Sequence, residues 1–245
     1  MTVPDDFRHA PIEAGGALRT FHPRRSPLGR RRADALARLW PLLGFSVHDA
    51  ALGATPLDAA GHLDQLALFG RQAPLVLEIG SGMGEATAAM AAADPTRDYL
   101  AVEAHLPGIA SLLGLVEDHD LHNVRVAHGD ALRLVEDAIA PGSLDAVHVF
   151  FADPWPKARH HKRRIIRDDV VELLASRLRP GGVLHCATDW ADYAEQMLDV
   201  LERCTSLVGS PAGYAPRPAH RPVTKFERRG LDLGHEVRDL VYARR

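Results

Sequence analysis

Cysteine is scarce in this sequence of 245 residues, and the two that occur, Cys186 and Cys204, form no CxxC pair. Their number and spacing argue against a disulfide scaffold and against a cysteine-based zinc site. The sequence also lacks any run of 18 apolar residues, so we predict no membrane span. The first residues include acids but no apolar segment, so we expect no signal peptide and a cytoplasmic protein.

Net charge is small, at −3, but the cations are unevenly distributed. Residues 19–32 hold six arginines, residues 157–167 hold six lysines and arginines, and neither segment contains an acid. The other 220 residues carry 17 cations and 32 acids. Two basic segments on an acidic body indicate a localised binding site for a polyanion. The alternative is a solvated basic loop together with a disordered basic arm.

Two parts of the chain differ in their patterning. Residues 1–32 are rich in Pro, Gly and Arg without periodicity, which predicts a mobile arm. Residues 33–245 are predicted to form a single domain. It opens with helical patterns and then alternates apolar runs with helical patterns, ending in a proline-rich loop at 211–222 and a last strand. We expect helices at 33–43, 57–69, 85–93, 106–117, 132–138, 168–178 and 191–203, and strands at 75–79, 99–102, 124–127, 146–151, 183–187 and 237–243.

This alternation predicts an α/β fold, a doubly wound and mostly parallel sheet with helices on both faces. In such sheets, ligands bind outside the carboxyl ends of the strands. The residues that follow each predicted strand are therefore the first candidates for a functional site.

A glycine turn follows the strand at 75–79, with Gly80, Gly82 and Gly84 spaced as GxGxG. Dinucleotide-binding folds use GxGxxG, and Glu85 would repel a pyrophosphate at the start of the helix. This disfavours a nicotinamide-dependent dehydrogenase. An adenosyl cofactor brings no phosphate, and its methionine ammonium group suits a carboxylate such as Glu78. The alternative is a structural turn between strand and helix.

Acids also end the next two predicted strands. Glu103 is placed to accept hydrogen bonds from both ribose hydroxyls, and Asp130 from the exocyclic amine of adenine. Each acid taken singly could be a helix cap. Acids after three successive strands, together with the glycine turn, favour a cofactor site.

The segment FADPWPK at 151–157 follows the fourth predicted strand of this series. Its two prolines stiffen the loop that carries Asp153 and Trp155. Trp155 offers a face on which a base could stack, and the alternative is a tryptophan buried over the sheet. The basic run that follows is suited to phosphates. Its two histidines, His160 and His161, have no partner cluster with metal-ligand spacing, so we predict no metal.

With these motifs, the sequence resembles the bacterial tRNA (guanine-N7)-methyltransferases. The segment at 151–157 and its basic continuation are the most specific part of the resemblance, which covers about residues 33–245. Residues 1–32 match poorly apart from LRTF at 18–21. The motifs that carry it are EIGSG (78–82), VE (102–103), GD (129–130), FADPWPK (151–157), RHHKRR (159–164), ATDW (187–190) and TKFE (224–227).

The resemblance implies a Rossmann-like class I methyltransferase fold with seven strands, the last antiparallel. It implies S-adenosylmethionine as cofactor, tRNA as partner and the variable-loop guanine at position 46 as target, in a monomer or homodimer. It places the cofactor site at Glu78, Gly80, Gly82, Glu103, Asp130 and Asp153, with Asp153 also catalytic. Contacts to the guanine nucleotide are implied for Lys157, Asp189, Thr224, Lys225, Phe226 and Glu227. Contacts to the rest of the RNA are implied for Arg159, His160, His161, Lys162, Arg163 and Arg164.

Guanine N7 already has an in-plane lone pair, so we interpret Asp153 as a positioning and electrostatic residue rather than a base. A carboxylate, Glu227 or Asp189, could accept the two donors on the pairing edge of guanine. The alternative for residues 224–227 is an edge strand, and for residues 188–190 a helix N-cap. Two other functions stay open: methylation of an exocyclic amine, which Trp155 disfavours, and RNA binding without catalysis.

Overall fold

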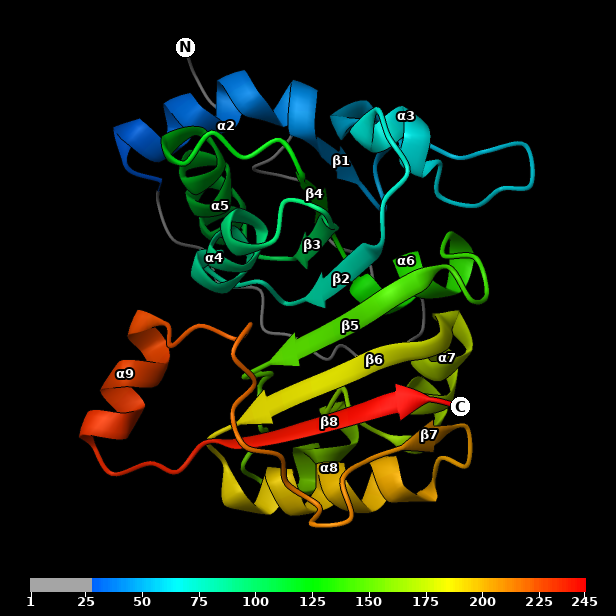
Figure 1. The fold of residues 1–245 in the computed structure, drawn as a ribbon. Coiled ribbons are helices and arrows are strands. Elements are labelled where there is room, and N and C mark those ends of the chain that lie inside the picture. Colours follow the sequence, from blue (N-terminus) through cyan, green and yellow to red (C-terminus); the bar gives the residue numbers. More distant parts are fainter. Residues whose placement is uncertain (1–27) are drawn as a thin grey trace. The chain divides into compact units, whose positions relative to one another are not determined.

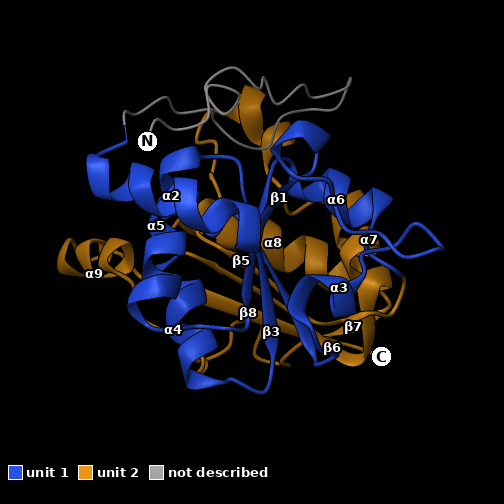
Figure 2. Cartoon of the chain, turned by 90° about the horizontal axis from the view of Figure 1, so that it is seen from above, with its two compact units in different colours: residues 1–17, 22–140 blue, residues 18–21, 141–245 orange. Residues whose placement is uncertain are grey.

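The computed structural model describes residues 28–245, which form two compact units, residues 28–140 (unit 1) and residues 141–245 (unit 2; Figure 2). Most of the predicted arm, residues 1–27, lies outside the described residues. The last three arginines of that arm belong to helix α2 (Arg30–Leu43; Figure 1). Within this described part, no helix is both long enough and apolar enough to cross a membrane.

Unit 1 contains four parallel strands in the order β1-β4-β3-β2. All five residues of β2 are buried, as expected for a strand covered on both faces. Strand β1 was not predicted, and the other three were. The strands are β1 (Gly44–Ser46), β2 (Leu75–Ile79), β3 (Asp98–Glu103) and β4 (Val124–His128).

The helices of unit 1 follow the predictions with one exception. Of the helix expected at 57–69, only Gln65–Phe69 is helical, so its first half was wrong. The reason is local: the Asp58 carboxylate accepts hydrogen bonds from the backbone N–H groups of Ala60 and His62, and Asp64 caps the short helix instead. The helical segments are α2, η1 (Ala50–Leu52), α3 (Gln65–Phe69), α4 (Glu85–Ala93), α5 (Leu106–Asp118) and α6 (Ala131–Asp137).

Unit 2 contains the other strands, in the order β5-β6-β8-β7. β5 and β6 are parallel, and β8 runs antiparallel to both of its neighbours, β6 and β7. The described residues thus contain eight strands, one more than the seven expected, and they confirm the α/β class and the antiparallel last strand. The elements are β5 (Leu144–Phe150), η2 (Ala158–Arg163), α7 (Asp168–Arg177), β6 (Leu178–Thr188), α8 (Ala191–Arg203), β7 (Leu207–Val208), α9 (Lys225–Asp232) and β8 (Arg238–Arg244).

Helix α9 replaces the edge strand considered as an alternative for residues 224–227, so that alternative was wrong. Thr224 is the N-cap, and its hydroxyl oxygen accepts the backbone N–H of Glu227. The TKFE motif therefore has the T-x-x-E spacing of a capping box. Figure 1 shows α9 at the carboxyl end of β6, which is the edge where ligands of this fold class bind.

Candidate active site

The glycine turn lies between β2 and α4 in unit 1, with Gly80 and Gly82 in the left-handed region at φ 75° and 56°. Other residues adopt this backbone only with strain. A side chain at either position would meet nothing within 4 Å, so the turn is open to a ligand. Gly108 packs directly against this turn, because a side chain at Gly108 would collide with the carbonyl oxygen of Gly82.

Glu103 is held against this turn. One of its carboxylate oxygens accepts the backbone N–H of Gly82 at 2.7 Å, and the other accepts the N–H of His105, also at 2.7 Å. Each carboxylate oxygen can accept a second hydrogen bond. Glu103 is therefore fixed at the glycine turn.

Glu78 is buried at the end of β2, and its carboxylate accepts a hydrogen bond from the hydroxyl of Thr87 at 2.5 Å. Burial raises the pKa of Glu78 to about 7, the negative charge of Glu103 adds to the rise, and the Thr87 bond opposes it. A buried carboxylate of this kind gains most from a cationic partner. Sequence reasoning missed Thr87, which sits on α4 and reaches Glu78 only through the fold.

Asp130 caps helix α6, with its side chain accepting the backbone N–H of Leu132 at 2.9 Å. Both sequence interpretations can hold here, since the carboxylate is half-buried and one oxygen remains for a ligand. The backbone N–H of Asp130 donates to His48 at 3.0 Å, and burial lowers the pKa of His48. His48 is a second residue that the sequence did not indicate.

In unit 2, the loop after β5 has an unusual backbone. Phe151 and Trp155 are non-glycine residues with positive φ, at 53° and 45°. Such strain is typical of functional sites, where the surroundings must hold it in place. Here the N–H of Phe151 donates to the carbonyl oxygen of Ala187 on β6 at 2.7 Å. Asp153 is half-buried between these two strained positions.

Two predicted contacts in this loop need correction. Trp155 is only 5% exposed, so it offers no face to a base, and the buried alternative was right. The guanidinium of Arg163 covers its ring at 4.9 Å, and His160 meets its edge. Arg164 is 1% exposed, so it is not placed to touch a phosphate.

Arg164 instead anchors the loop to helix α8. Its guanidinium donates to the carbonyl oxygen of Pro154 at 2.7 Å and to the side chains of Gln196 and Asp192 at 2.5 Å, and it lies over the ring of Tyr193. The remaining cations of the basic segment stay accessible. Lys157, Arg159 and Lys162 are exposed, while His160, His161 and Arg163 are half-buried.

Unit 2 brings three separate motifs together at the carboxyl ends of β5 and β6. Phe226 of TKFE packs edge-on against Phe151 of FADPWPK, with ring centroids 5.5 Å apart. Asp189 of ATDW lies beside α9, where its carboxylate bonds His235 at 3.0 Å. Phe226 is 61% exposed although it touches Phe151, so its outer face is accessible. Asp189 is not the N-cap of α8, a position that Trp190 occupies without a side-chain cap.

Arg221, which sequence reasoning missed, supports this cluster from the interior. It is 1% exposed and donates to both oxygens of Glu227, at 2.7 and 3.0 Å. It also donates to Asp239 on β8, at 2.6 and 2.9 Å, and its guanidinium lies 5.7 Å from the ring of Phe151. Burial lowers the pKa of Arg221, but the bonds to Asp239 and Glu227 outweigh it and the net shift is upward. Glu227 is thus engaged inside the protein.

A family model described as "Putative methyltransferase" matches residues 72–240. A tRNA (guanine-N(7)-)-methyltransferase of Streptomyces coelicolor is 52% identical over 93% of this chain and 81% of its own length. One of Nitrosospira multiformis is 57% identical over 75% of this chain and 80% of its own. Among solved structures, the 16S rRNA methyltransferase KamB covers 77% of this chain and 94% of its own at 16% identity and a TM-score of 0.52, a likeness of fold alone.

Proposed function

The chain belongs to the tRNA (guanine-N(7)-)-methyltransferase family, and from this premise we propose a role for the residues that each of its units assembles. The enzyme methylates N7 of guanine in tRNA with S-adenosylmethionine as the donor. We propose the variable-loop guanine at position 46 as the target, and the cytoplasm as the location of an enzyme acting as a monomer or a homodimer.

Unit 1 has the groups that the cofactor requires. Glu78 is a buried carboxylate suited to the methionine ammonium group, because a cation there offsets the cost of burying its charge. Gly80 and Gly82 leave space above the turn. Glu103 and Asp130 are each held by a backbone N–H group. Glu103 accepts hydrogen bonds from the ribose hydroxyls, and Asp130 accepts one from the adenine amine. On the family resemblance alone, we also propose Asp153 as a residue that contacts S-adenosylmethionine.

Unit 2 recognises the guanine nucleotide, and the observation that carries this assignment is the convergence of three motifs around the contact between Phe151 and Phe226. The exposed face of Phe226 stacks on the base, an interaction worth about 1–3 kcal/mol. Asp189 accepts the N1–H and the exocyclic amine of guanine. Thr224 and Lys225 border the same helix terminus, and Lys157 binds the nucleotide's phosphate from the neighbouring loop.

Glu227 has a different role from the one its motif suggests. Both of its oxygens accept from Arg221 in the interior, so we assign it to positioning the first turn of α9 rather than to direct recognition of the base. The phosphates of the tRNA are bound by the exposed cations of the basic segment, chiefly Arg159 and Lys162, with His160, His161 and Arg163 beside them.

The chemistry makes few demands on the protein. When bound, S-adenosylmethionine supplies a methyl group on a sulfonium sulfur, which keeps the electron pair of the broken carbon–sulfur bond as N7 gains the carbon. No proton leaves guanine, so Asp153 acts by position and charge. Its carboxylate offsets the positive charge that develops on the purine. Alignment of N7 with the methyl group supplies much of the rate.

The target position is tested with two tRNA transcripts that differ only in residue 46, guanine in one and adenine in the other, each incubated with methyl-labelled S-adenosylmethionine. We expect label to enter only the transcript with guanine. Equal labelling of both transcripts would refute position 46 while leaving the reaction itself intact.

A further inference from the structure

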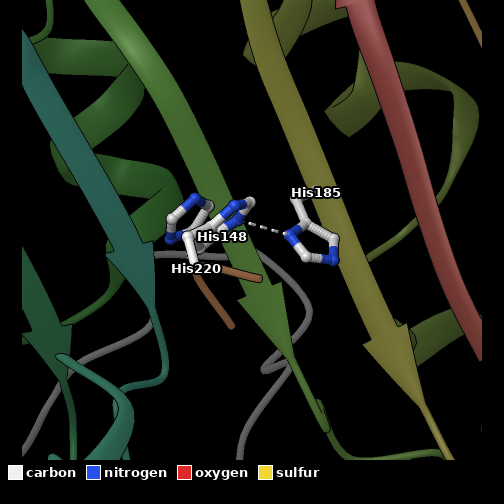
Figure 3. A group of neighbouring side chains, drawn as sticks. All are labelled: His148, His185 and His220. Carbon is white, nitrogen blue, oxygen red and sulfur yellow. Dashed lines mark hydrogen bonds between the residues drawn. The ribbon is translucent and has the colours of Figure 1, made fainter. Parts of the chain in front are cut away.

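Three histidines from distant parts of the sequence meet inside unit 2. His148 on β5 and His185 on β6 are register partners on neighbouring parallel strands, and His220 comes from the loop before α9 (Figure 3). One ring nitrogen of each lies within 4.8 Å of those of the other two. His148 and His185 are buried, whereas His220 is exposed and gives access from solvent.

The spacing of two of these rings matches a metal site. Nδ1 of His185 and Nε2 of His220 are 3.2 Å apart. In a tetrahedral zinc site with Zn–N bonds of about 2.0–2.1 Å, two ligand nitrogens are separated by roughly 3.3 Å. His185 and His220 therefore already have the separation of two ligands. The ring of His148 is stacked on that of His220, at an angle of 14°, and has to turn about its side-chain bonds to complete the site.

The groups behind His185 also fit a metal ligand. Its other nitrogen, Nε2, lies 2.7 Å from a carboxylate oxygen of the buried Asp239. Histidine ligands of metals usually donate their second N–H to a carboxylate in this way, which directs the free lone pair to the metal.

The local charge favours a cation. Arg221, Asp239 and Glu227 form one buried group, and the sum of their formal charges is one net negative charge. A divalent ion on three neutral imidazoles would lie next to this excess charge. Three histidines with an open fourth position are a zinc-binding set.

We propose that His148, His185 and His220 bind one Zn²⁺ ion, which fixes the loop carrying His220 and Arg221 against β5 and β6. Because Arg221 positions Glu227 at the start of α9, the ion stabilises the segment that leads into TKFE. This role is structural and does not depend on the methyl transfer.

The test uses the full-length chain without a histidine tag, stripped with a chelator and titrated with ZnCl₂ by calorimetry, with bound metal measured after dialysis. We expect one zinc ion per chain. His220→Ala, at an exposed position, should weaken binding by at least about tenfold, the smaller end of what removal of even a supporting residue costs a metal site. His122→Ala, an exposed histidine of unit 1, is the control and should bind zinc like the wild type.

A second measurement does not depend on any variant. Titration of the stripped wild-type protein with CoCl₂ should give the visible absorption bands of four-coordinate cobalt, and ZnCl₂ should abolish them. The proposal is overturned if the wild type retains no zinc and gives no such bands, or if His220→Ala binds zinc as tightly as the wild type. In either case the three histidines form only a hydrogen-bonded cluster.

Discussion

The guanidinium of Arg221 donates to both carboxylate oxygens of Glu227 in the interior of unit 2, at 2.7 and 3.0 Å. The same group donates to Asp239 on β8, so one side chain connects the last strand to the first turn of α9. Thr224, at the N-cap of that helix, is held in turn by its bond to the N–H of Glu227. The segment proposed to bind guanine thus rests on a buried ion pair.

Substitution of Arg221 by Met should lower the free energy of unfolding by roughly 3–5 kcal/mol, because it leaves two buried carboxylates without a cation. The matched control is Arg203→Met, which breaks the exposed pair between Arg203 and Asp168 and should cost about 0–1 kcal/mol. Urea denaturation measures both. Similar small decreases in the two variants would show that the Arg221 network contributes no more than a surface pair.

The buried carboxyl of Glu78 predicts two opposite pH dependences. Its pKa is raised in the folded state to about 7, so the folded state binds more protons than the unfolded state between its ordinary value and pH 7. Stability without cofactor should fall as pH rises through that range, by up to about 3 kcal/mol. Denaturation of wild type and Glu78→Gln across pH should show a fall that the variant lacks.

Cofactor affinity should change in the other direction. The methionine ammonium group prefers the ionised form of Glu78, so S-adenosylmethionine should bind about tenfold more tightly near pH 8 than near pH 6. Calorimetry at both pH values provides the measurement. An affinity independent of pH in the wild type would remove Glu78 as the partner of the ammonium group.

Lys162 and Arg164 are two residues apart but should respond differently. Lys162 is exposed, so Lys162→Ala should reduce the slope of log affinity against log salt by about one unit, because the variant binds one phosphate fewer. Arg164→Ala should act through folding, since Arg164 binds Pro154, Gln196 and Asp192. Binding of tRNA at several salt concentrations, with denaturation of each variant, separates the two. A full salt slope in Lys162→Ala would contradict the phosphate assignment.

Phe226→Ala should raise the KM for tRNA about fivefold or more, because it removes a stacking interaction of about 1–3 kcal/mol. Leu233 is the control: it is exposed, it ends the same helix, and its replacement by Ala should leave the KM unchanged. Steady-state kinetics with saturating S-adenosylmethionine gives both values. If the two variants behave alike, Phe226 is an ordinary surface residue.

Local sequence signals predicted most of the fold. The strand at 75–79 and the helices at 85–93 and 191–203 were predicted to the residue. The strand is apolar except for Glu78 and runs directly into the glycine turn, and the two helices have clear boundaries. The helix expected at 57–69 failed where Asp58 and Asp64 compete for backbone N–H groups.

Long-range contacts account for what the sequence could not predict. Trp155 and Arg164 stand in a polar run. Nothing in the local sequence shows that Arg163 covers the ring of Trp155 or that Arg164 packs on the ring of Tyr193. Arg221 lies in a proline-rich loop, yet it pairs with Asp239, 18 residues away. The three histidines lie far apart in the sequence, on β5, on β6 and in the loop before α9. They form no ligand motif there and come together only when β5 and β6 pair.

The proposed reaction and the role of Asp153 are tested most directly by nucleoside mass spectrometry of unmodified tRNA after incubation with methyl-labelled S-adenosylmethionine and the enzyme. Wild type should give a 7-methylguanosine peak, and Asp153→Ala that retains its fold should give none. Label in another nucleoside, or an undiminished 7-methylguanosine peak with Asp153→Ala, would contradict the assignment of the site.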